Sequence, residues 1–577
     1  MRRVWRIVDV EPSHVRRLAE GLRVPTFLAR LLVARGIREP DEARQFLAPA
    51  LKDLSEPDAV PGMAEAAERI VEAIRQGKTI CVYGDYDADG VCATAILLGC
   101  LKLSGAQADY YIPRRIEEGY GLNAEALEKL RVDRRVDVVV TVDCGIRSVE
   151  AARRAKELGI ELIVTDHHRM GPELPEAAAI VHPRLGNGCS PARDLCGAGV
   201  ALKLAWAIAQ QLTGRQRVGP RYREFLLESL LYAAIATIAD VVPLLGENRL
   251  ITWYGLKVLR QQTPVGLGEL MQVAGVADDR DVDAEAVAFR LAPRLNAVGR
   301  LGHARHAVEL LLTRSPERAR ELAGYLHEVN RQRQSLEGSI YREAMAMLTE
   351  NPEFESARAI VLGRESWHPG VVGIVAARIA QKFYRPTILI TLSRPVAQGS
   401  GRSIPGYDLC DAVERCSEHL LGFGGHAAAV GVKLEPRALD AFRDAIAAHA
   451  AETLDEDDLK RTITIDSEAA LGELSAGAIR WLEAMGPFGQ ANPRPRLLST
   501  DVQLVGEPRL VGESRRHVML RFRQHSTTLG AIGFGMADRV TELRPGERFD
   551  VVYTPELNHY QGYTSVRLNL VDFRRSE

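Results

Sequence analysis

TICVYGDYDADGVCAT, residues 79–94, joins a short apolar run to three carboxylates at alternate positions, Asp85, Asp87 and Asp89. The apolar run indicates a buried strand, and the Asp and Gly residues after it indicate a turn at the strand's carboxyl end. Three like charges this close repel one another, so a stable protein must compensate them. Taken alone, the segment is explained equally well by a solvated turn.

Four further β-rich runs follow between residues 60 and 245, separated by helical stretches: ADYYIP, VDVVVTVD, IELIVTD and AAIVHP. This alternation predicts a parallel sheet with helices on both faces, which binds ligands at the carboxyl ends of its strands. A second α/β unit is expected over about 355–455, and the chain after the acidic segment LDEDDLK reads as mainly β, consistent with a small barrel. The expected fold class is therefore multidomain α/β.

The composition is that of an ordinary globular protein, with 577 residues of which 46% are hydrophobic and 26% charged. The eight cysteines include no Cys-x-x-Cys pair, so neither a zinc ribbon nor a disulfide framework is indicated. We expect a cytoplasmic protein without a membrane span, because the N-terminus lacks an apolar signal core and the longest apolar stretch is broken by Asp240. With a net charge of −2, any polyanion it binds must be met by a local group of cations.

Other acids and two histidines follow the same set of strands. TVDCG ends a strand at Asp143, VTDHH ends another with an acid and a histidine pair, and Asp240 interrupts an apolar helix. Oxygen and imidazole ligands suit Mn²⁺ or Mg²⁺ better than a thiolate-seeking metal. Two such ions sharing a bridging Asp, about 3.5–4 Å apart, would neutralise the acids and activate a water against a phosphoryl group. A DHH triplet alone is more often a surface feature, whereas a carboxylate within an apolar helix is costly to bury unpaired.

Together and in order, these motifs resemble the DHH phosphoesterases, and within them the RecJ-type single-stranded-DNA-specific exonucleases. The resemblance covers nearly the whole chain and rests on GDYDADG, IPRRIEEGYG, TVDCGI, VTDHH, CGAGVALKLAW, IADVVPL, APRLNAVGRLG, WHPGVVGIVAARI, GSGRS, FGGHAAAVG and GPFGQANPRP. Pattern and resemblance together predict five parts: an N-terminal helical segment (1–60), a DHH catalytic domain (61–303), a long connecting helix (304–350), a DHH-associated substrate-binding domain (351–455) and an OB-like single-strand-binding domain (456–577).

The resemblance implies two divalent ions, with the choice between Mn²⁺ and Mg²⁺ left open. Asp143 would bridge them, Asp87 with Asp85 would complete one site, and the other ligands would complete the second. Asp166 would orient an imidazole, and His168 would face the scissile phosphate, where it neutralises charge or assists the leaving group. The implied metal ligands are Asp85, Asp87, Asp89, Asp143, His167 and Asp240.

The resemblance also implies substrate contacts from motifs rich in glycine and arginine, because glycine lets a phosphate approach the backbone and arginine pairs with it. Arg114 is an alternative to Arg115. Tyr120 would stack on a base or wedge a duplex, or would simply pack at a strand edge. The implied substrate residues are Arg115, Tyr120, Asn296, Arg300, Ser400, Arg402, Ser403, Gly425 and His426.

Residues 481–577 contain 13 arginines and no lysine against 11 acids, with interspersed aromatics that include Phe522, Phe534, Tyr553 and Tyr563. Aromatics in a small barrel are more often core, but the resemblance favours an OB-like fold that stacks bases and follows phosphates. The expected function is a metal-dependent 5′→3′ exonuclease that releases mononucleotides from single-stranded DNA in repair and recombination. Two rivals are a phosphodiesterase acting on very short oligonucleotides or cyclic dinucleotides, and an inactive single-strand-binding scaffold. We also expect a monomer that binds single-stranded DNA, with a RecQ-like helicase and a single-strand-binding protein as partners.

Overall fold

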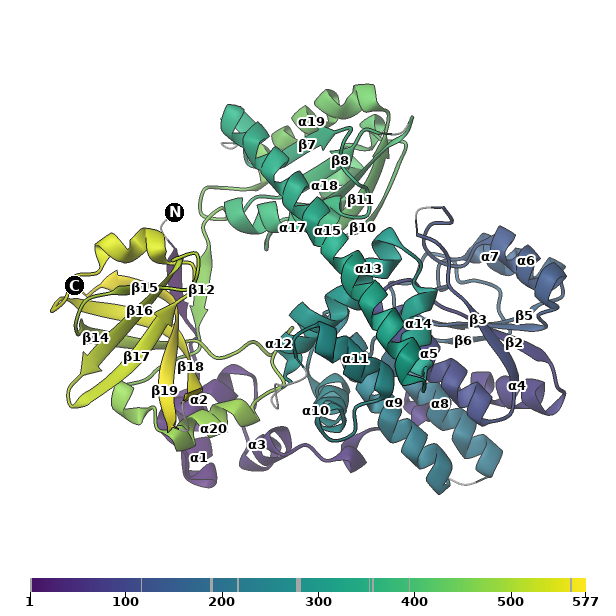
Figure 1. Cartoon of the computed structure of the whole chain (residues 1–577), viewed down its shortest axis with the longest axis horizontal. Helices are drawn as coiled ribbons and strands as arrows, with labels where there is room; N and C mark the ends of the chain where they lie inside the picture. The colour runs from purple at the N-terminus through teal and green to yellow at the C-terminus, as the bar shows by residue number, and fades with distance from the viewer. Residues whose placement is uncertain are drawn as a thin grey trace.

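A computed structural model describes residues 3–115, 117–186, 190–214, 217–276, 282–351, 353–354, 357–393, 395–560 and 563–576. Figure 1 shows three lobes: a parallel α/β lobe on the right, a second α/β lobe at the top and a β lobe on the left. The long helix α15 runs diagonally between the first two. Among the described residues, no helix is both long and apolar enough to cross a membrane.

The right-hand lobe is built on a parallel sheet in the order β3-β2-β4-β5-β6, which confirms the predicted α/β class. Its strands are β2 (Thr79–Tyr83), β3 (Gln107–Tyr111), β4 (Val138–Thr141), β5 (Glu161–Thr165) and β6 (Ala179–Val181). One face packs against α4 (Met63–Arg75), α5 (Ala88–Leu103) and α8 (Gly197–Thr213), and the other against α6 (Ala124–Arg134) and α7 (Val149–Glu157). Both faces are therefore apolar, as parallel sheets require.

Further helices complete this lobe: α9 (Pro220–Ala239), α10 (Gly246–Gln261), α11 (Val265–Val273), α12 (Ala284–Ala286), a π-helical turn (Val287–Leu291), α13 (Ala292–Leu301) and α14 (Arg305–Leu312). The expectation that Asp240 interrupts an apolar helix is wrong, because α9 ends at Ala239 and Asp240 is its C-cap. The carboxylate therefore lies at the end of the helix.

The connection to the second lobe is α15 (Pro316–Glu350), a helix of 35 residues, roughly 50 Å long. It is separate from α14, because Ser315 accepts a hydrogen bond from the Arg318 N–H and Pro316 occupies the first helical position, where proline is tolerated. α15 packs against α11, α13 and α14 at one end and against α17 (Val372–Phe383) at the other. It thus holds the two lobes at a set separation.

The second lobe has a mixed sheet in the order β10-β11-β9-β8-β7, in which only β7 and β8 are parallel. Its strands are β7 (Ile360–Arg364), β8 (Thr387–Thr391), β9 (Ala397–Arg402), β10 (Gly422–His426) and β11 (Ala429–Leu434). Its other helices are α18 (Leu409–Arg415) and α19 (Leu439–Thr453).

The β lobe has the sheet order β13-β14-β18-β19-β17-β16-β15, and an extra β14–β16 pairing connects distant strands of this sheet. Its strands are β13 (Ser467–Glu468), β14 (Leu497–Leu504), β15 (Arg509–Val511), β16 (His517–Gln524), β17 (Thr527–Gly533), β18 (Arg548–Tyr560) and β19 (Tyr563–Arg575), and α20 (Ala476–Ala484) packs beside them. Phe522 and Tyr553 are fully buried in its core, so their expected role in base stacking is wrong. Phe534 and Tyr563 are 55% and 81% exposed.

The N-terminal residues belong to the β lobe. β1 (Val4–Ile7) pairs in parallel with β12 (Thr462–Ile465). One apolar core is shared by the strands of the β lobe and three N-terminal helices: α1 (Pro12–Leu22), α2 (Thr26–Ala34) and α3 (Pro40–Leu47). The first helices of the chain therefore complete the core of the last domain.

This shared core predicts that Leu31→Ala, at a fully buried position of α2, destabilises the β lobe by about 3 kcal/mol. The change should appear as a lower urea midpoint for the β lobe in pulse proteolysis. Leu421→Ala, at a position that is 58% exposed in the second lobe, is the matched control. If both variants shifted the midpoint equally, the N-terminal helices would not contribute to that core.

Candidate metal centre

The acidic turn after β2 places its three carboxylates by helix capping. Asp85 follows the strand, and Asp87 is the N-cap of α5, where its Oδ1 accepts from the Asp89 and Gly90 N–H groups at 2.9 and 3.1 Å. A side chain at Gly90 would meet the Asp85 backbone, with its Cβ 2.6 Å from the Asp85 carbonyl oxygen. The three alternating acids thus lie at different places: Asp85 follows β2, Asp87 is the N-cap of α5 and Asp89 lies in its first turn.

The N-terminus of α8 supports the next two acids. The Gly197 and Ala198 N–H groups both donate to the Asp89 carboxylate at 2.7 Å. Asp143, directly after β4, has a left-handed φ of 61°, and a Cβ at Gly197 would lie 2.6 Å from the Asp143 Cβ. Close packing against a helix N-terminus therefore holds both carboxylates in a buried position.

His167 lies among acids from different elements. Its Nε2 is 3.0 Å from the Asp143 carboxylate, 3.6 Å from that of Asp89 and 3.7 Å from that of Asp240. Burial, together with the charge of the adjacent His168, lowers the pKa of His167 to about 3. A neutral imidazole is the form that binds a metal.

Asp166 orients the second histidine. One of its oxygens accepts from the His167 and His168 N–H groups and lies 2.8 Å from His168 Nδ1, while the other accepts from the Ile146 N–H at 3.0 Å. Although burial opposes both charges, this pair lowers the pKa of Asp166 to about 2 and raises that of His168 to about 9. His168 is therefore cationic at neutral pH.

The structure brings the implied ligands into three groups, each with atoms within 4.8 Å of one another. Two of these groups match the ligand sets that the family resemblance implies. In the third group, His168 joins Asp143 and His167. Asp143 occurs in two of the groups and lies between the two sets. The groups are Asp85, Asp87 and Asp143; Asp89, His167 and Asp240; and Asp143, His167 and His168.

The electrostatics of this cluster fit divalent cations. Burial and neighbouring acids raise the pKa of Asp85 and Asp143, and raise that of Asp240 to about 8. Among the buried side-chain atoms that have no hydrogen-bond partner in the described part of the chain, three belong to this cluster: Asp85 Oδ1, Asp143 Oδ1 and His167 Nε2. Two carboxylate oxygens and one imidazole nitrogen left unpaired are donors for Mn²⁺ or Mg²⁺, which would restore full ionisation.

Three arginines from separate elements gather beside the acids. Burial and the charge of Arg115 lower the pKa of Arg300, to about 10, and that of Arg402. Arg300 donates to the Gly370 carbonyl at 3.0 Å, and Arg402 donates to the Ser400 hydroxyl at 3.0 Å. Arg114 instead pairs with Glu117, so Arg115 is the arginine of that motif that joins the cluster.

Tyr120 lies against the metal centre and not at a strand edge. Its hydroxyl is 3.1 Å from His168 Nδ1, and its ring contacts the rings of His168 and Tyr86 edge to face. The Arg115 guanidinium lies over the Tyr86 ring, 5.1 Å from its centroid.

Three other residues expected to bind substrate, Asn296, Ser403 and Gly425, have close contacts within the protein. Asn296 Oδ1 accepts from the Ala88 N–H at 2.8 Å and so supports the start of α5, while the Ser403 hydroxyl donates to the Tyr407 carbonyl at 2.7 Å. Gly425 has a φ of 150° in the β10–β11 hairpin, where a Cβ would lie 2.2 Å from the Ala429 carbonyl oxygen. The structure thus gives Asn296 and Ser403 supporting contacts inside the protein.

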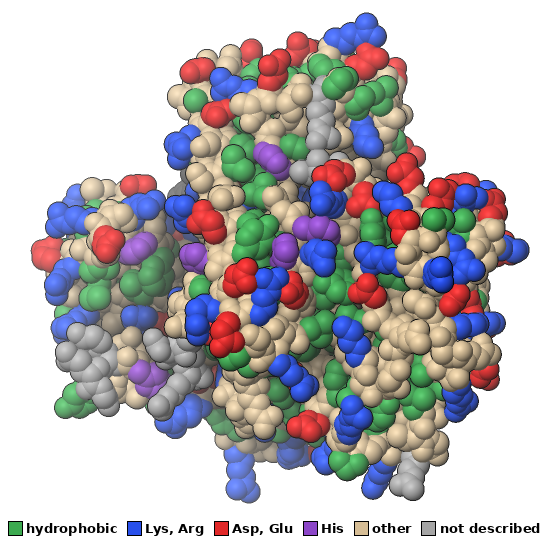
Figure 2. Space-filling view, turned by 45° about the vertical axis from the view of Figure 1, so that its right-hand side comes forward, with side chains coloured by type: hydrophobic (Ala, Val, Ile, Leu, Met, Phe, Trp, Pro, Cys, Tyr) green, Lys and Arg blue, Asp and Glu red, His purple; other side chains and the backbone are tan. Residues whose placement is uncertain are grey.

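His426 faces the catalytic lobe and reveals two residues that the motifs did not predict. Burial lowers its pKa, with further contributions from His168, Arg169 and Arg147. Both arginines are exposed and follow ligand-bearing strand ends, four residues after Asp143 and one after His168. In Figure 2, histidines with Lys or Arg beside them lie where the upper lobe meets the lobe below it.

Comparison with known proteins defines the class first. The model of the DHH family N-terminal domain matches residues 79–235, and the DHHA1 domain matches residues 356–452. The RecJ OB domain matches residues 465–572. The two α/β lobes are thus those of a DHH-type protein, and a further domain follows them.

The relatives give the particular family. The single-stranded-DNA-specific exonuclease RecJ of Bacillus subtilis is 38% identical over 99% of this chain and 71% of its own length, and that of Salmonella typhimurium is 34% identical over 95% and 96%. A crystal structure of RecJ with Mn²⁺ from Thermus thermophilus covers all of this chain and 80% of that one, with a TM-score of 0.82 and 34% identity. The chain belongs to the RecJ family.

The buried like charges predict that Asp143→Asn raises the melting temperature of the catalytic lobe in EDTA. Asn tolerates the left-handed backbone and removes one charge, so we expect a gain of about 1 kcal/mol, or about 2–4 °C. The same variant should lose most of the stabilisation that Mn²⁺ gives the parent, as measured by differential scanning fluorimetry. Asp133→Asn, at an exposed position of α6, is the control. An Mn²⁺-dependent shift equal to that of the parent would remove Asp143 from the ligand set.

Proposed function

We propose that this protein is a metal-dependent exonuclease that hydrolyses the phosphodiester bonds of single-stranded DNA from the 5′ end to mononucleotides. The observation that carries the proposal is the meeting of two acid sets with a group of arginines from both α/β lobes. The names of the relatives support the substrate, and the crystal structures of Thermus thermophilus RecJ with Mn²⁺ and with Mg²⁺ support the metals.

Asp85, Asp87 and Asp143 would hold one divalent cation, and Asp89, His167 and Asp240 would hold a second, with Asp143 between them. Bound there, the two cations would activate a water and neutralise the phosphate oxygens in an in-line displacement. The α8 N-terminus contributes by holding Asp89 through two backbone N–H groups.

His168 supplies a proton. Because Asp166 accepts from its Nδ1–H, the protonated ring carries its second proton on Nε2, which can neutralise the phosphate or pass to the leaving oxygen. The Tyr120 hydroxyl, 3.1 Å from Nδ1, limits the rotation of the ring.

Arg115, Arg300 and Arg402, with the Ser400 hydroxyl, would bind backbone phosphates beside the metals. Their mutual repulsion, reflected in the lowered pKa values of Arg300 and Arg402, is relieved by a polyanion. A single DNA strand presents such phosphates, and the site does not have to accommodate a complementary strand.

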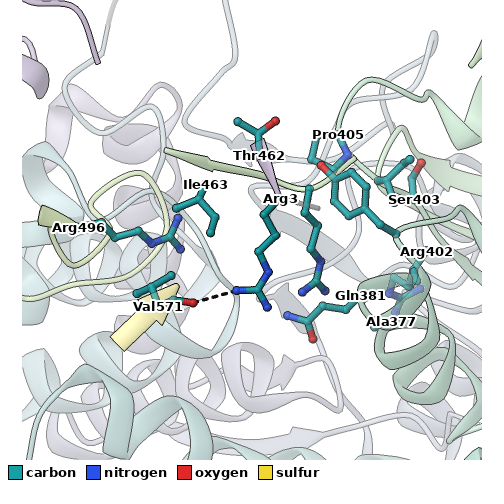
Figure 3. A pocket seen from close by; sticks show the side chains of 14 residues that line it. Arg3, Ala377, Gln381, Arg402, Ser403, Pro405, Thr462, Ile463, Arg496 and Val571 are labelled. Carbon is teal, nitrogen blue, oxygen red and sulfur yellow. Dashed lines mark hydrogen bonds between the residues drawn. The ribbon is translucent and has the colours of Figure 1, made fainter. Parts of the chain in front are cut away.

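A cavity of about 460 Å³ extends this cationic surface toward the β lobe. It lies between α17, the β1–β12 pair and Val571, and Figure 3 shows arginine side chains around it. The described residues that line it include no acid and four arginines, which are Arg3, Arg402, Arg461 and Arg496. Arg402 belongs to both the arginine group beside the metals and the cavity, so a single strand bound at those arginines would continue into the cavity toward the β lobe.

An enzyme restricted to single strands needs another protein to separate a duplex. We therefore include a RecQ-like helicase and a single-strand-binding protein as proposed partners. We also propose a monomer, because one chain supplies both acid sets and the arginines beside them.

Metal removal and ligand loss test the activity. With 5′- and 3′-labelled single strands, EDTA should abolish degradation and Mn²⁺ should restore it, with mononucleotides released from the 5′ end. Asp89→Asn should lower the rate about 10³-fold, because it removes a carboxylate buried at the metal centre. Binding of the labelled strand, measured in EDTA, should stay within about twofold of the parent, since the phosphate contacts remain. Degradation within about tenfold of the parental rate would contradict the proposal.

The cavity can be tested by charge removal. Arg461→Gln and Arg496→Gln should each weaken binding to single-stranded DNA and reduce the salt slope by about 0.7. The degradation rate at saturating DNA should be unchanged. Arg437→Gln, at an exposed position on the second lobe, is the matched control. A parental salt slope in both cavity variants would place the strand elsewhere.

A further inference from the structure

The loop over residues 485–494 leaves the β lobe after α20 and reaches the catalytic lobe. It contains most of the motif GPFGQANPRP, whose purpose the metal centre does not explain. The Leu244 N–H donates to the Gln490 carbonyl at 2.8 Å, and Arg249 donates to the carbonyls of Ala484 and Gly486 at 3.2 and 2.6 Å. On the catalytic-lobe side, Leu244 and Arg249 follow Asp240 by four and nine residues.

The loop is braced by hydrogen bonds that its own polar groups form. The fully buried Asn492 donates from Nδ2 to the carbonyls of Met485 and Pro487, both at 2.9 Å, and its Oδ1 accepts from Arg35 Nε at 3.0 Å. Gly489 and Asn492 exchange backbone hydrogen bonds at 2.9 and 3.2 Å. A loop braced in this way can set the position of a neighbouring segment.

The segment that it meets has an unfavourable backbone conformation. Asp240 caps α9, and the next residue, Val241, has a left-handed φ of 58° although it is β-branched and 62% exposed. Packing of the Val241 side chain cannot hold this conformation, so its flanks must do so. One flank is α9, and the other is Leu244, which is buried and bonded to Gln490.

The contact at Leu244 is close. A Cβ placed on Gly489 would lie 2.7 Å from Leu244 Cδ1, so a side chain at this position would force the buried Leu244 side chain to shift. Pro243, the residue before Leu244, has a second contact that fixes this segment, because Asn248 Nδ2 donates to its carbonyl at 3.1 Å.

Arg249 strengthens the same junction in an unusual way. It is buried, and among the residues that the structure describes it forms no ion pair. Its guanidinium stacks on Phe46, 3.9 Å from the ring centroid, and donates to carbonyls at the C-terminal end of α20, where the helix dipole is negative. A buried cation without a carboxylate is costly, so its location here suggests a purpose beyond packing.

A second contact runs to the arginine side of the site. Arg494 donates to Asp283 at 2.8 Å, and Asp283 caps α12 by accepting from the Ala286 N–H. The chain then passes through the π-helical turn into α13, which carries Arg300. One loop therefore contacts the segment that follows a metal-centre acid and the segment that leads into the helix of a phosphate-site arginine.

We propose that the 485–494 loop is a positioning element that holds Asp240 in its place in the metal centre, through the Gly489 and Gln490 contacts with Leu244. It couples attachment of the β lobe to the geometry of the Asp89, His167 and Asp240 set. The proposal rests on the proposed function only in taking Asp240 as a metal ligand.

The test is Mn²⁺ binding to the full chain without DNA, measured by isothermal titration calorimetry. Gly489→Val should displace Leu244 and weaken one of two Mn²⁺ sites by about tenfold, in the direction of Asp240→Asn, while the other stays within about twofold. Gly477→Val, at an exposed position of α20 where a Cβ would make an ordinary contact with Ser475 Oγ at 3.6 Å, is the matched control and should bind as the parent does. In Gly489→Val/Leu244→Ala the valine has room, so the double variant should bind Mn²⁺ no more weakly than Leu244→Ala alone.

Parental Mn²⁺ affinities in a folded Gly489→Val, checked by circular dichroism and melting temperature, would overturn the proposal and leave the loop as a domain attachment only. If Gly489→Val does not fold, Leu244→Ala and Arg249→Met replace it, and parental affinities in both would also overturn the proposal. A parent that binds two Mn²⁺ ions but leaves single-stranded DNA intact would refute the proposed exonuclease without affecting the loop.

Discussion

The repulsion among buried carboxylates is the constraint on which the rest of this structure depends. Asp85, Asp89 and Asp143 are almost fully buried at one edge of a parallel sheet, where low dielectric strengthens their repulsion. Backbone N–H groups compensate only part of it: the α8 N-terminus binds Asp89, while Asp85 and Asp143 each keep an unpaired oxygen. A fold that retains such a site sacrifices stability for a place where divalent cations bind strongly.

The cationic groups are arranged to complement that edge without neutralising it. Arg115, Arg300 and Arg402 lie near enough to affect one another, yet Arg300 donates to a carbonyl, Arg402 donates to a hydroxyl and Arg115 lies over the Tyr86 ring. Direct ion pairs with the acids would have occupied the ligands that a metal needs. The helix α15 packs on the catalytic lobe at one end and on α17 at the other, so it sets the distance between the acids and the lobe that carries Arg402.

The β lobe is built from both ends of the chain and also contacts the catalytic lobe. Its core includes the N-terminal helices, its β12 strand pairs with β1, and its 485–494 loop meets the segment after Asp240. A truncation after residue 460 would remove all three contacts at once, so single side chains separate strand binding from metal binding more cleanly.

The sequence by itself determined the parallel sheet, the strand-end acids and histidines, and their likeness to one family, because strand periodicity and motif order are local properties of the chain. It did not determine that Asp240 caps a helix, that Phe522 and Tyr553 are core, that Asn296 supports α5, or that Arg147 and Arg169 approach His426. These features depend on which parts of the folded chain pack against one another. The pairing of residues 4–7 with 462–465 and the contact of Gly489 with Leu244 join positions hundreds of residues apart, and no local pattern encodes a contact that exists only once both segments are folded.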